Sequence, residues 1–296
     1  MRATQQLLFG IFIIMLCALL GMLLSFVGGI IFYGGQEGVS LLYAQQDFDD
    51  SNYISLLRFS QVVQSVFMFG VPSLLLAYLY GERAAQYLYL DGKARFQTWL
   101  YCLLVFVLAL PIVSLSGLIN EQVRLPQAWS SIETWMKTSE DFAQFVVQKM
   151  VDEPHAPIWI NYLVIAVVPA LVEELLFRGA LQRIFIKMSK NTHWGIWISA
   201  FIFSAIHMQF YGFLPRMLLG ALFGYIVCYS GSLWVSIALH FINNSFALHF
   251  EFYRQASEES SFFSPESLSD VSIGFVLLAL AGATLSVYLL RRMRTD

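Results

Sequence analysis

Long apolar runs recur from one end of this 296-residue chain to the other, and they constrain its fold more than any other feature. A run of about 20 apolar residues can cross a hydrocarbon layer of about 30 Å as one helix. With 58% hydrophobic and 12% charged residues and a mean hydropathy of +0.65, the chain lies outside the range of soluble globular proteins. The sequence therefore predicts an all-α, polytopic membrane helix bundle of about eight transmembrane helices, at residues 7–32, 60–80, 98–119, 158–186, 194–212, 214–230, 232–250 and 271–290.

Basic residues predict how these spans are oriented. An even number of spans puts both termini on one side, and the cluster Arg291, Arg292 and Arg294 places that side in the cytoplasm by the positive-inside bias. We therefore expect an integral multi-pass protein, in the plasma or inner membrane if the source is bacterial. The other basic residues then fall on the same side, namely Arg83, Lys93, Arg95, Arg183, Lys187 and Lys190. The opposite loops carry mostly acid, namely Asp47, Asp49, Asp50, Glu258 and Glu259.

Charge and cysteine usage exclude several other classes of protein. A net charge of -3 without a long basic block gives no reason to expect nucleic acid as a partner. Cys17, Cys102 and Cys228 lie in apolar runs and none is spaced as C-x-x-C, so neither a disulfide framework nor a thiolate metal site is expected. The run from Leu7 to Phe32 is too long for the core of a signal peptide, and we expect it to form the first membrane helix.

The longest polar stretch, residues 120–157, separates the third and fourth spans. Its apolar residues recur at helical spacing, which is typical of an amphipathic helix on the outer membrane surface. A solvated connector that packs on the bundle explains the same pattern. In the sixth span, Gly220 and Gly224 form a small-xxx-small pair that indicates close helix packing. The apolar residues of the polar stretch are Ile132, Trp135, Met136, Phe142, Phe145, Val146, Met150 and Val151.

The fourth span carries three ionisable residues, Glu173, Glu174 and Arg178, in the middle of an apolar helix. Each such residue costs about 2.5–3.5 kcal/mol in a membrane, so it marks a candidate functional site. Residues four apart share a helix face, so Glu174 can pair with Arg178, while Glu173 points elsewhere as the candidate base. Pro169, one turn upstream, removes a backbone hydrogen bond and can kink the helix near the carboxylates. The alternative is an inert buried ion network.

The fifth and seventh spans add neutral polar groups. Phe203 and His207 lie four apart in the fifth span, and His240 and Asn244 lie four apart in the seventh, so each pair shares a face. Taken singly, such residues are explained by packing and interhelical hydrogen bonds. Together, two histidines, two carboxylates and an amide supply metal ligands, a base and an oxyanion donor. The polar residues left aside are Asn243, a less favoured substitute for Asn244, and His155, His193 and His249, at span edges or in loops.

The three motifs resemble those of a known family. Glu-Glu-x-x-x-Arg at 173–178, Phe-x-x-x-His at 203–207 and His-x-x-x-Asn at 240–244 are similar, in order and spacing, to the motifs of the CAAX protease and bacteriocin-processing (CPBP) family of intramembrane endopeptidases. The resemblance covers about 158–250 and implies an eight-helix bundle with a membrane-embedded cavity. It implies that Glu173 activates water with help from His207, and that His240 and Asn244 act on the scissile carbonyl. Glu174, Arg178 and Phe203 would support them.

With that resemblance, the chain divides into three parts. Residues 1–157 hold the first three helices and an outer loop, and residues 158–250 form a CAAX protease-like catalytic core of helices four to seven. Residues 251–296 hold a second outer loop, the eighth helix and the basic tail.

The reaction expected is peptide-bond hydrolysis, by a glutamic or a metallo-endopeptidase of the CPBP type. Glu173 would take a proton from a water held by His207, while Asn244 and His240 stabilise the oxyanion. One divalent metal, Zn²⁺, is a candidate cofactor, because His207, His240 and Glu173 would leave a fourth position for water. The sequence lacks the H-E-x-x-H of common zinc proteases, so metal-dependent and metal-free mechanisms both stay open.

Two other functions are compatible with the composition. A proton-coupled transporter also keeps charged residues in its spans, but it usually has related halves, and none is visible here. A catalytically idle membrane scaffold or immunity protein would keep the bundle and lose the site, whereas every motif position is filled here. The expected partners are the lipid bilayer and a membrane-embedded or lipidated protein or peptide substrate.

Overall fold

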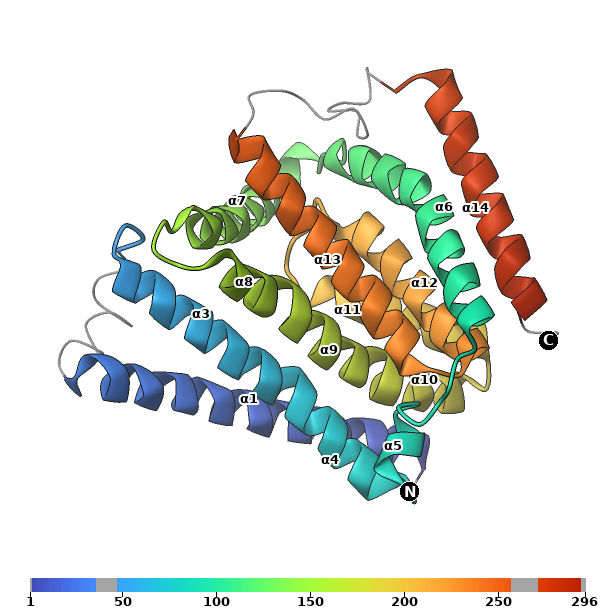
Figure 1. The fold of residues 1–296 in the computed structure, drawn as a ribbon, viewed down its shortest axis with the longest axis horizontal. Coiled ribbons are helices and arrows are strands. Elements are labelled where there is room, and N and C mark those ends of the chain that lie inside the picture. The colour runs from blue at the N-terminus through green and yellow to red at the C-terminus, as the bar shows by residue number, and fades with distance from the viewer. Residues whose placement is uncertain (1, 36–46, 257–270, 294–296) are drawn as a thin grey trace.

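The computed structural model describes residues 2–35, 47–256 and 271–293, and every regular element in these ranges is a helix (Figure 1). Four elements depart from α-helical geometry: η1, η3 and η4 are π-helical turns, and η2 is a 3₁₀ turn. In chain order the elements are α1 (Ala3–Tyr33), α3 (Ser51–Ser65), η1 (Val66–Gly70), α4 (Val71–Tyr80), α5 (Ala84–Tyr87), α6 (Phe96–Glu121), η2 (Gln127–Trp129), α7 (Ser130–Asp152), α8 (Ile158–Asn161), η3 (Tyr162–Val167), α9 (Val168–Glu174), η4 (Leu175–Leu181), α10 (Gln182–Ser189), α11 (Thr192–Ala205), α12 (Phe213–Ser230), α13 (Leu233–Ala256) and α14 (Ile273–Met293).

Seven of the eight predicted spans coincide with long helical rods, and the fifth, predicted at 194–212, corresponds to the shorter α11, which ends at Ala205. Two rods join several elements end to end, at Ser51–Tyr80 and Ile158–Ser189. In the described part of the chain, six rods are long and apolar enough to cross a membrane, and the two that do not qualify are α11 and α13. With 14 residues, α11 is shorter than the roughly 20 that a span needs, and α13 interrupts its apolar sequence with His240 and Asn244. The predicted polytopic helix bundle of an integral membrane protein is confirmed, with six rather than eight helices meeting both criteria.

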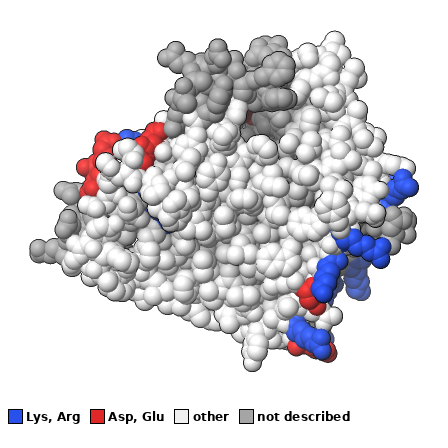
Figure 2. Space-filling view, viewed as in Figure 1, with Lys and Arg blue, Asp and Glu red and all other residues white. Residues whose placement is uncertain are grey.

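Charged side chains gather at opposite ends of the molecule. Figure 2 shows Lys and Arg at one end, with a few acidic residues among them, Asp and Glu at the other, and a broad uncharged surface between. Such a band suits contact with hydrocarbon, where charged side chains are costly. Arg294, Glu258 and Glu259, which contributed to the orientation argument, lie outside the described residues. The cytoplasmic location of the two termini stays a prediction.

The fourth-span rod, Ile158–Ser189, lies in the middle of the bundle. Figure 1 shows the order across the molecule as α1, α3–α4, α8–α9, α13, α6 and α14. The contacts agree: α9 packs on α13 and η1, α10 packs on α11, and α12 packs on α6 and α13. The apolar window of this rod is 50% buried, against 22–33% for the other five qualifying helices. The most enclosed rod is therefore the one that carries the charged triplet.

Two apolar clusters hold the rods together. One joins α1, α4, η4 and α10 and includes Leu76 and Phe177, and the other joins α6, α12, α13 and α14 and includes Phe106. Cys17 belongs to the first cluster and Cys102 to the second. All three cysteines are free, and they act as packing residues, as predicted.

The polar stretch between the third and fourth spans contains α7, an amphipathic helix that packs on the bundle, and its place on the outer membrane surface stays a prediction. It packs against α3, α8 and α13, with Glu140 and Met150 buried. Its Ile132, Trp135 and Phe142 side chains remain exposed. Helix α7 therefore docks on the bundle along one face and presents apolar side chains along another.

Helix α14 docks on α6 with its backbone close to that of its partner. A Cβ atom at Gly282 would collide with the carbonyl oxygen of Leu108 on α6. One turn further along, the Ser286 hydroxyl donates to the Val105 carbonyl at 3.1 Å. Small residues that allow such close approach are the usual basis of helix packing in membranes.

Gly282→Ala should therefore destabilise the protein by about 1–3 kcal/mol, because the added methyl group displaces α14 from α6. The matched control is Gly274→Ala in the same helix, where a Cβ would meet only Ser272 Oγ at 3.7 Å. There the higher helix propensity of Ala should leave stability unchanged or improved. Equilibrium unfolding in detergent measures both changes, and equal stability of the two variants would contradict the close approach.

Candidate active site

Glu174 lies at the centre of a buried polar network. Its Oε1 is 2.8 Å from Arg178 Nη1 and 2.9 Å from His240 Nδ1, and its Oε2 accepts a hydrogen bond from the Ser236 hydroxyl. The side chains of Glu174 and Arg178 are 0% and 1% exposed. A buried carboxylate is tolerated only where its charge and lone pairs are satisfied, and here the Arg178 charge and hydrogen bonds from His240 and Ser236 do so. The pairing predicted from the i, i+4 spacing is confirmed.

The Arg178 guanidinium links the fourth-span rod to its neighbours. Its Nη2 donates to the Gly220 carbonyl of α12 at 3.3 Å, and its central carbon lies 4.4 Å from the centre of the Phe203 ring of α11, within cation–π range. Gln182 makes the equivalent bond one turn later, to the Gly224 carbonyl at 3.2 Å. A Cβ at Gly220 would approach Arg178 Nη2 to 3.3 Å, so a small residue keeps this space open. Gly220 and Gly224 thus allow close helix packing, as predicted, and they also leave their carbonyl oxygens accessible to Arg178 and Gln182.

Glu173 points away from Arg178, toward two histidines. Its Oε1 is 4.0 Å from His207 Nε2, and its Oε2 is 3.8 Å from His240 Nε2. The Glu173 and His207 side chains keep 12% and 26% exposure, whereas Glu174 keeps none. The structure thus brings three of the predicted site residues together, at the more accessible edge of the buried network.

Hydrogen bonds on the far side of each ring determine which nitrogen faces Glu173. His207 Nδ1 lies 2.8 Å from the Phe203 carbonyl, and His240 Nδ1 lies 2.9 Å from the Glu174 carboxylate. Carbonyl and carboxylate oxygens only accept, so both Nδ1 atoms carry the proton. A neutral ring then presents the lone pair of Nε2 to Glu173. Three acceptors facing one another favour a species that donates protons, such as water, or a cation.

The spacing of these three acceptors fits water better than zinc. Zn²⁺ with ligands at about 2.0–2.1 Å in a tetrahedron holds the ligand atoms about 3.3–3.4 Å apart, whereas the two nitrogen–oxygen pairs are 4.0 and 3.8 Å apart. Among the described residues, no group of three or more His, Cys, Asp or Glu side chains converges closely enough to hold a metal ion. A water with hydrogen bonds of about 2.8 Å bridges such a pair at an angle of about 90°. The predicted zinc ion stays a prediction, and no step below depends on it.

Asn244 is tied to the fourth-span rod by a backbone group that Pro169 leaves free. Proline has no N–H to donate to the carbonyl four residues earlier, which here is that of Ile165. The Asn244 Nδ2 group donates to that carbonyl at 3.5 Å. Asn243 in turn donates to Asn244 Oδ1 at 3.5 Å. These contacts hold Asn244 on the site side of α13, and its role on the substrate carbonyl stays a prediction.

Sequence reasoning missed Ser236, which donates to Glu174. Ser236 lies four residues before His240, so extending the i, i+4 pattern one turn toward the N-terminus of α13 would have identified it. The histidines outside the motifs, His155, His193 and His249, are all exposed.

A second residue that was missed is Arg216, in the first turns of α12. Its Nη2 donates to Gln209 Oε1 at 2.7 Å, and its charge interacts electrostatically with Glu173. Gln209 is two residues beyond His207, so this bond helps to hold the segment that carries the histidine. An arginine in a predicted span is itself a signal, by the rule that singled out Arg178.

Comparison with known proteins identifies the segment that contains this site. Residues 155–246 match the family model described as type II CAAX prenyl endopeptidase Rce1-like. This segment is similar to the Rce1-like family, and we refer to it as the Rce1-like segment. The resemblance predicted from the three motifs is thereby confirmed, and the Rce1-like segment contains every predicted site residue.

A curated relative extends the comparison beyond the family model. The chain is 32% identical over 111 residues to the "Uncharacterized protein YpbD" of Bacillus subtilis (strain 168). The aligned region covers 35% of this chain and 54% of that protein. The chain thus spans about half the length of the curated relative that it matches. No solved structure matches the chain.

Arg178→Met should lower the free energy of unfolding by about 3–5 kcal/mol, because it leaves Glu174 charged and buried without its cation. The double variant Glu174→Gln/Arg178→Met should recover part of this loss, since no unpaired charge remains. Arg183→Met is the matched control, because its guanidinium donates to the Gln86 and Tyr87 carbonyls and lies over the Tyr87 and Tyr89 rings, but forms no salt bridge with a described residue. Equilibrium unfolding in detergent measures all three. A double variant less stable than Arg178→Met would show that the ion pair is not the stabilising unit.

Proposed function

We propose that this chain is an intramembrane endopeptidase that hydrolyses a peptide bond of a membrane-associated or lipidated protein. The observation that carries the proposal is the position of Glu173, whose carboxylate faces His207 Nε2 and His240 Nε2 across 4.0 and 3.8 Å instead of pairing with Arg178. A carboxylate and two imidazoles in this arrangement can bind a water and remove its proton. The Rce1-like match over residues 155–246 supports protease chemistry at this site.

In the proposed first step, a water donates one hydrogen bond to Glu173 and one to the Nε2 lone pair of His207. Glu173 accepts the proton as the water oxygen attacks the scissile carbonyl carbon, so a carbon–oxygen bond forms and the carbonyl oxygen becomes an oxyanion. The Phe203 carbonyl, which accepts from His207 Nδ1 at 2.8 Å, keeps the Nε2 lone pair directed at the water.

Asn244 and His240 stabilise the oxyanion in this proposal. The Asn244 amide has two N–H groups, and only one is needed for the Ile165 carbonyl. For this role the His240 ring carries a proton on both nitrogens: Nδ1 donates to the Glu174 carboxylate and Nε2 donates to the oxyanion, so Glu173 and His207 alone accept from the water. The proton on Glu173 then passes to the leaving amine as the carbon–nitrogen bond breaks, which regenerates the carboxylate.

A divalent ion, if bound by His207, His240 and Glu173, would polarise the same water. It would require these three side chains to move closer together than they lie in the structure. In the proposed mechanism Glu173 therefore takes the proton, His207 holds the water, and no metal ion is needed.

Glu173→Gln should lower the rate of cleavage of a membrane-tethered reporter by about 10²–10⁴-fold, because an amide cannot accept the proton. The variant should unfold at the same temperature as the wild type, which separates loss of chemistry from loss of fold. Glu121→Gln, at the exposed end of α6, is the matched control and should keep full activity.

Cleavage of the reporter in proteoliposomes measures the rates. Full activity of Glu173→Gln would overturn the mechanism. Intact reporter with the wild type and with both variants would instead favour the transporter or the idle scaffold.

A further inference from the structure

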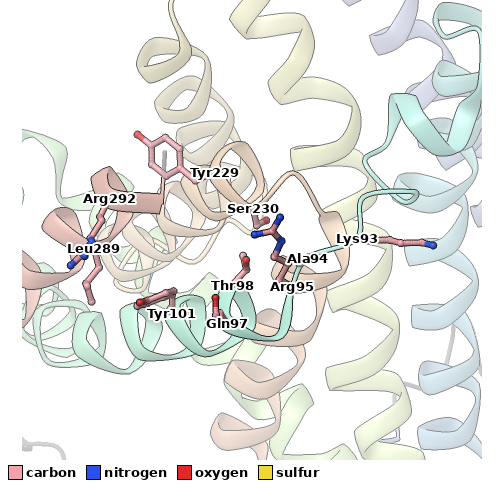
Figure 3. Close-up of a pocket in the computed structure, with 10 residues that line it drawn as sticks. All are labelled: Lys93, Ala94, Arg95, Gln97, Thr98, Tyr101, Tyr229, Ser230, Leu289 and Arg292. Carbon is pink, nitrogen blue, oxygen red and sulfur yellow. The ribbon is translucent and has the colours of Figure 1, made fainter. Parts of the chain in front are cut away.

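A second feature, a pocket of about 320 Å³, lies outside the site at the basic end of the bundle. Figure 3 shows it between the start of α6, the end of α12 and the end of α14. Its lining includes Arg95, Thr98 and Tyr101 before and within α6, Tyr229 and Ser230 in α12, and Arg292 in α14. The pocket is near the lower limit of the roughly 300–1,000 Å³ typical of small-molecule sites, and thus suits a compact ligand.

The lining of this pocket is cationic. The ten described residues that form it include Lys93, Arg95 and Arg292, and no carboxylate. In Figure 3 the Arg95 guanidinium points toward Ser230, the Arg292 side chain lies beside Leu289 and points away from Arg95, and the Lys93 ammonium points away from both. Helix α6 begins here at Phe96, and its first turn has no side-chain cap, so the positive end of its dipole adds to the same field. Arginine pairs readily with phosphate through two parallel hydrogen bonds.

The pocket also lies where three candidate membrane spans end. Helix α6 starts at Phe96, α12 ends at Ser230, and the span of α14 ends at Arg292. Next to the pocket, both α6 and α14 expose apolar side chains, including Leu100 on α6 and Leu285 on α14. A cation-lined pocket beside apolar helix surfaces matches an amphiphile with an anionic head and apolar chains.

We propose that this pocket binds the phosphate of an anionic phospholipid headgroup. Arg95 and the Thr98 hydroxyl hold the phosphate, the charges of Lys93 and Arg292 add to the positive field around the headgroup, and the acyl chains lie along α6 and α14. Free phosphate would bind the same polar groups but would make no contact with the adjoining apolar surfaces of α6 and α14. The position at the ends of the spans therefore favours the lipid as the source of the phosphate.

The test is lipid retention by the full chain, measured by native mass spectrometry. The protein is exchanged into an equimolar mixture of phosphatidylglycerol and phosphatidylcholine in detergent. Wild-type protein should retain phosphatidylglycerol in preference to phosphatidylcholine, and Arg95→Gln/Arg292→Gln should lower that preference by about tenfold or more. The matched control, Arg83→Gln/Arg291→Gln, removes the same charge from the same end outside the pocket and should keep the preference. Thr98→Val, which keeps every charge, should weaken it partly.

The other outcomes would overturn the proposal. Equal retention of the two lipids by the wild type would show that the protein does not select an anionic headgroup. Equal losses of preference in the pocket and control variants would show that the basic surface in general, and not this pocket, selects the lipid. In a second arm, inorganic phosphate is titrated against delipidated protein. Binding as tight as that of phosphatidylglycerol, with the same dependence on Arg95 and Arg292, would identify free phosphate as the ligand.

Discussion

The arrangement of the site depends on the buried ion pair between Glu174 and Arg178. Because both charges are matched within one helix, Glu174 can also accept from His240 on α13, while Arg178 reaches the Gly220 carbonyl on α12. A single pair thus positions two neighbouring helices against the fourth-span rod. It also leaves Glu173, on the adjacent face, to contact the histidines. Burial of these charges is costly in isolation, and the surrounding donors and acceptors offset that cost.

The segment that carries His207 is held by side chains from other helices, because it lies beyond the last residue of α11 and has no regular helical hydrogen bonds of its own. Two other elements provide these side chains. The Tyr211 amide donates to the Glu140 carboxylate of α7 at 3.1 Å, and the Arg216 guanidinium of α12 donates to Gln209 at 2.7 Å. The outer helix α7, to which the sequence assigned no chemistry, therefore has a structural connection to the site.

Features set by periodicity along one helix were predictable from the sequence. Apolar runs located all eight rods, and spacing predicted the Glu174–Arg178 pair, because both depend on geometry within a single element. Contacts between rods were not predictable in the same way. The bond from His240 to Glu174 joins residues 66 positions apart, and the bond from Asn244 to Ile165 joins residues 79 apart. Such contacts depend on which helix faces meet, and no residue spacing specifies that.

The central claim is that Glu173 removes the proton from a water held by His207, without a metal ion. Its most direct test is the cleavage rate of purified protein in proteoliposomes before and after exhaustive chelation, with the zinc content of the same sample measured alongside. The acceptor spacing predicts an unchanged rate in protein that holds far less than one zinc per chain. One zinc per chain, loss of cleavage on chelation and its return when zinc is added back would contradict the claim.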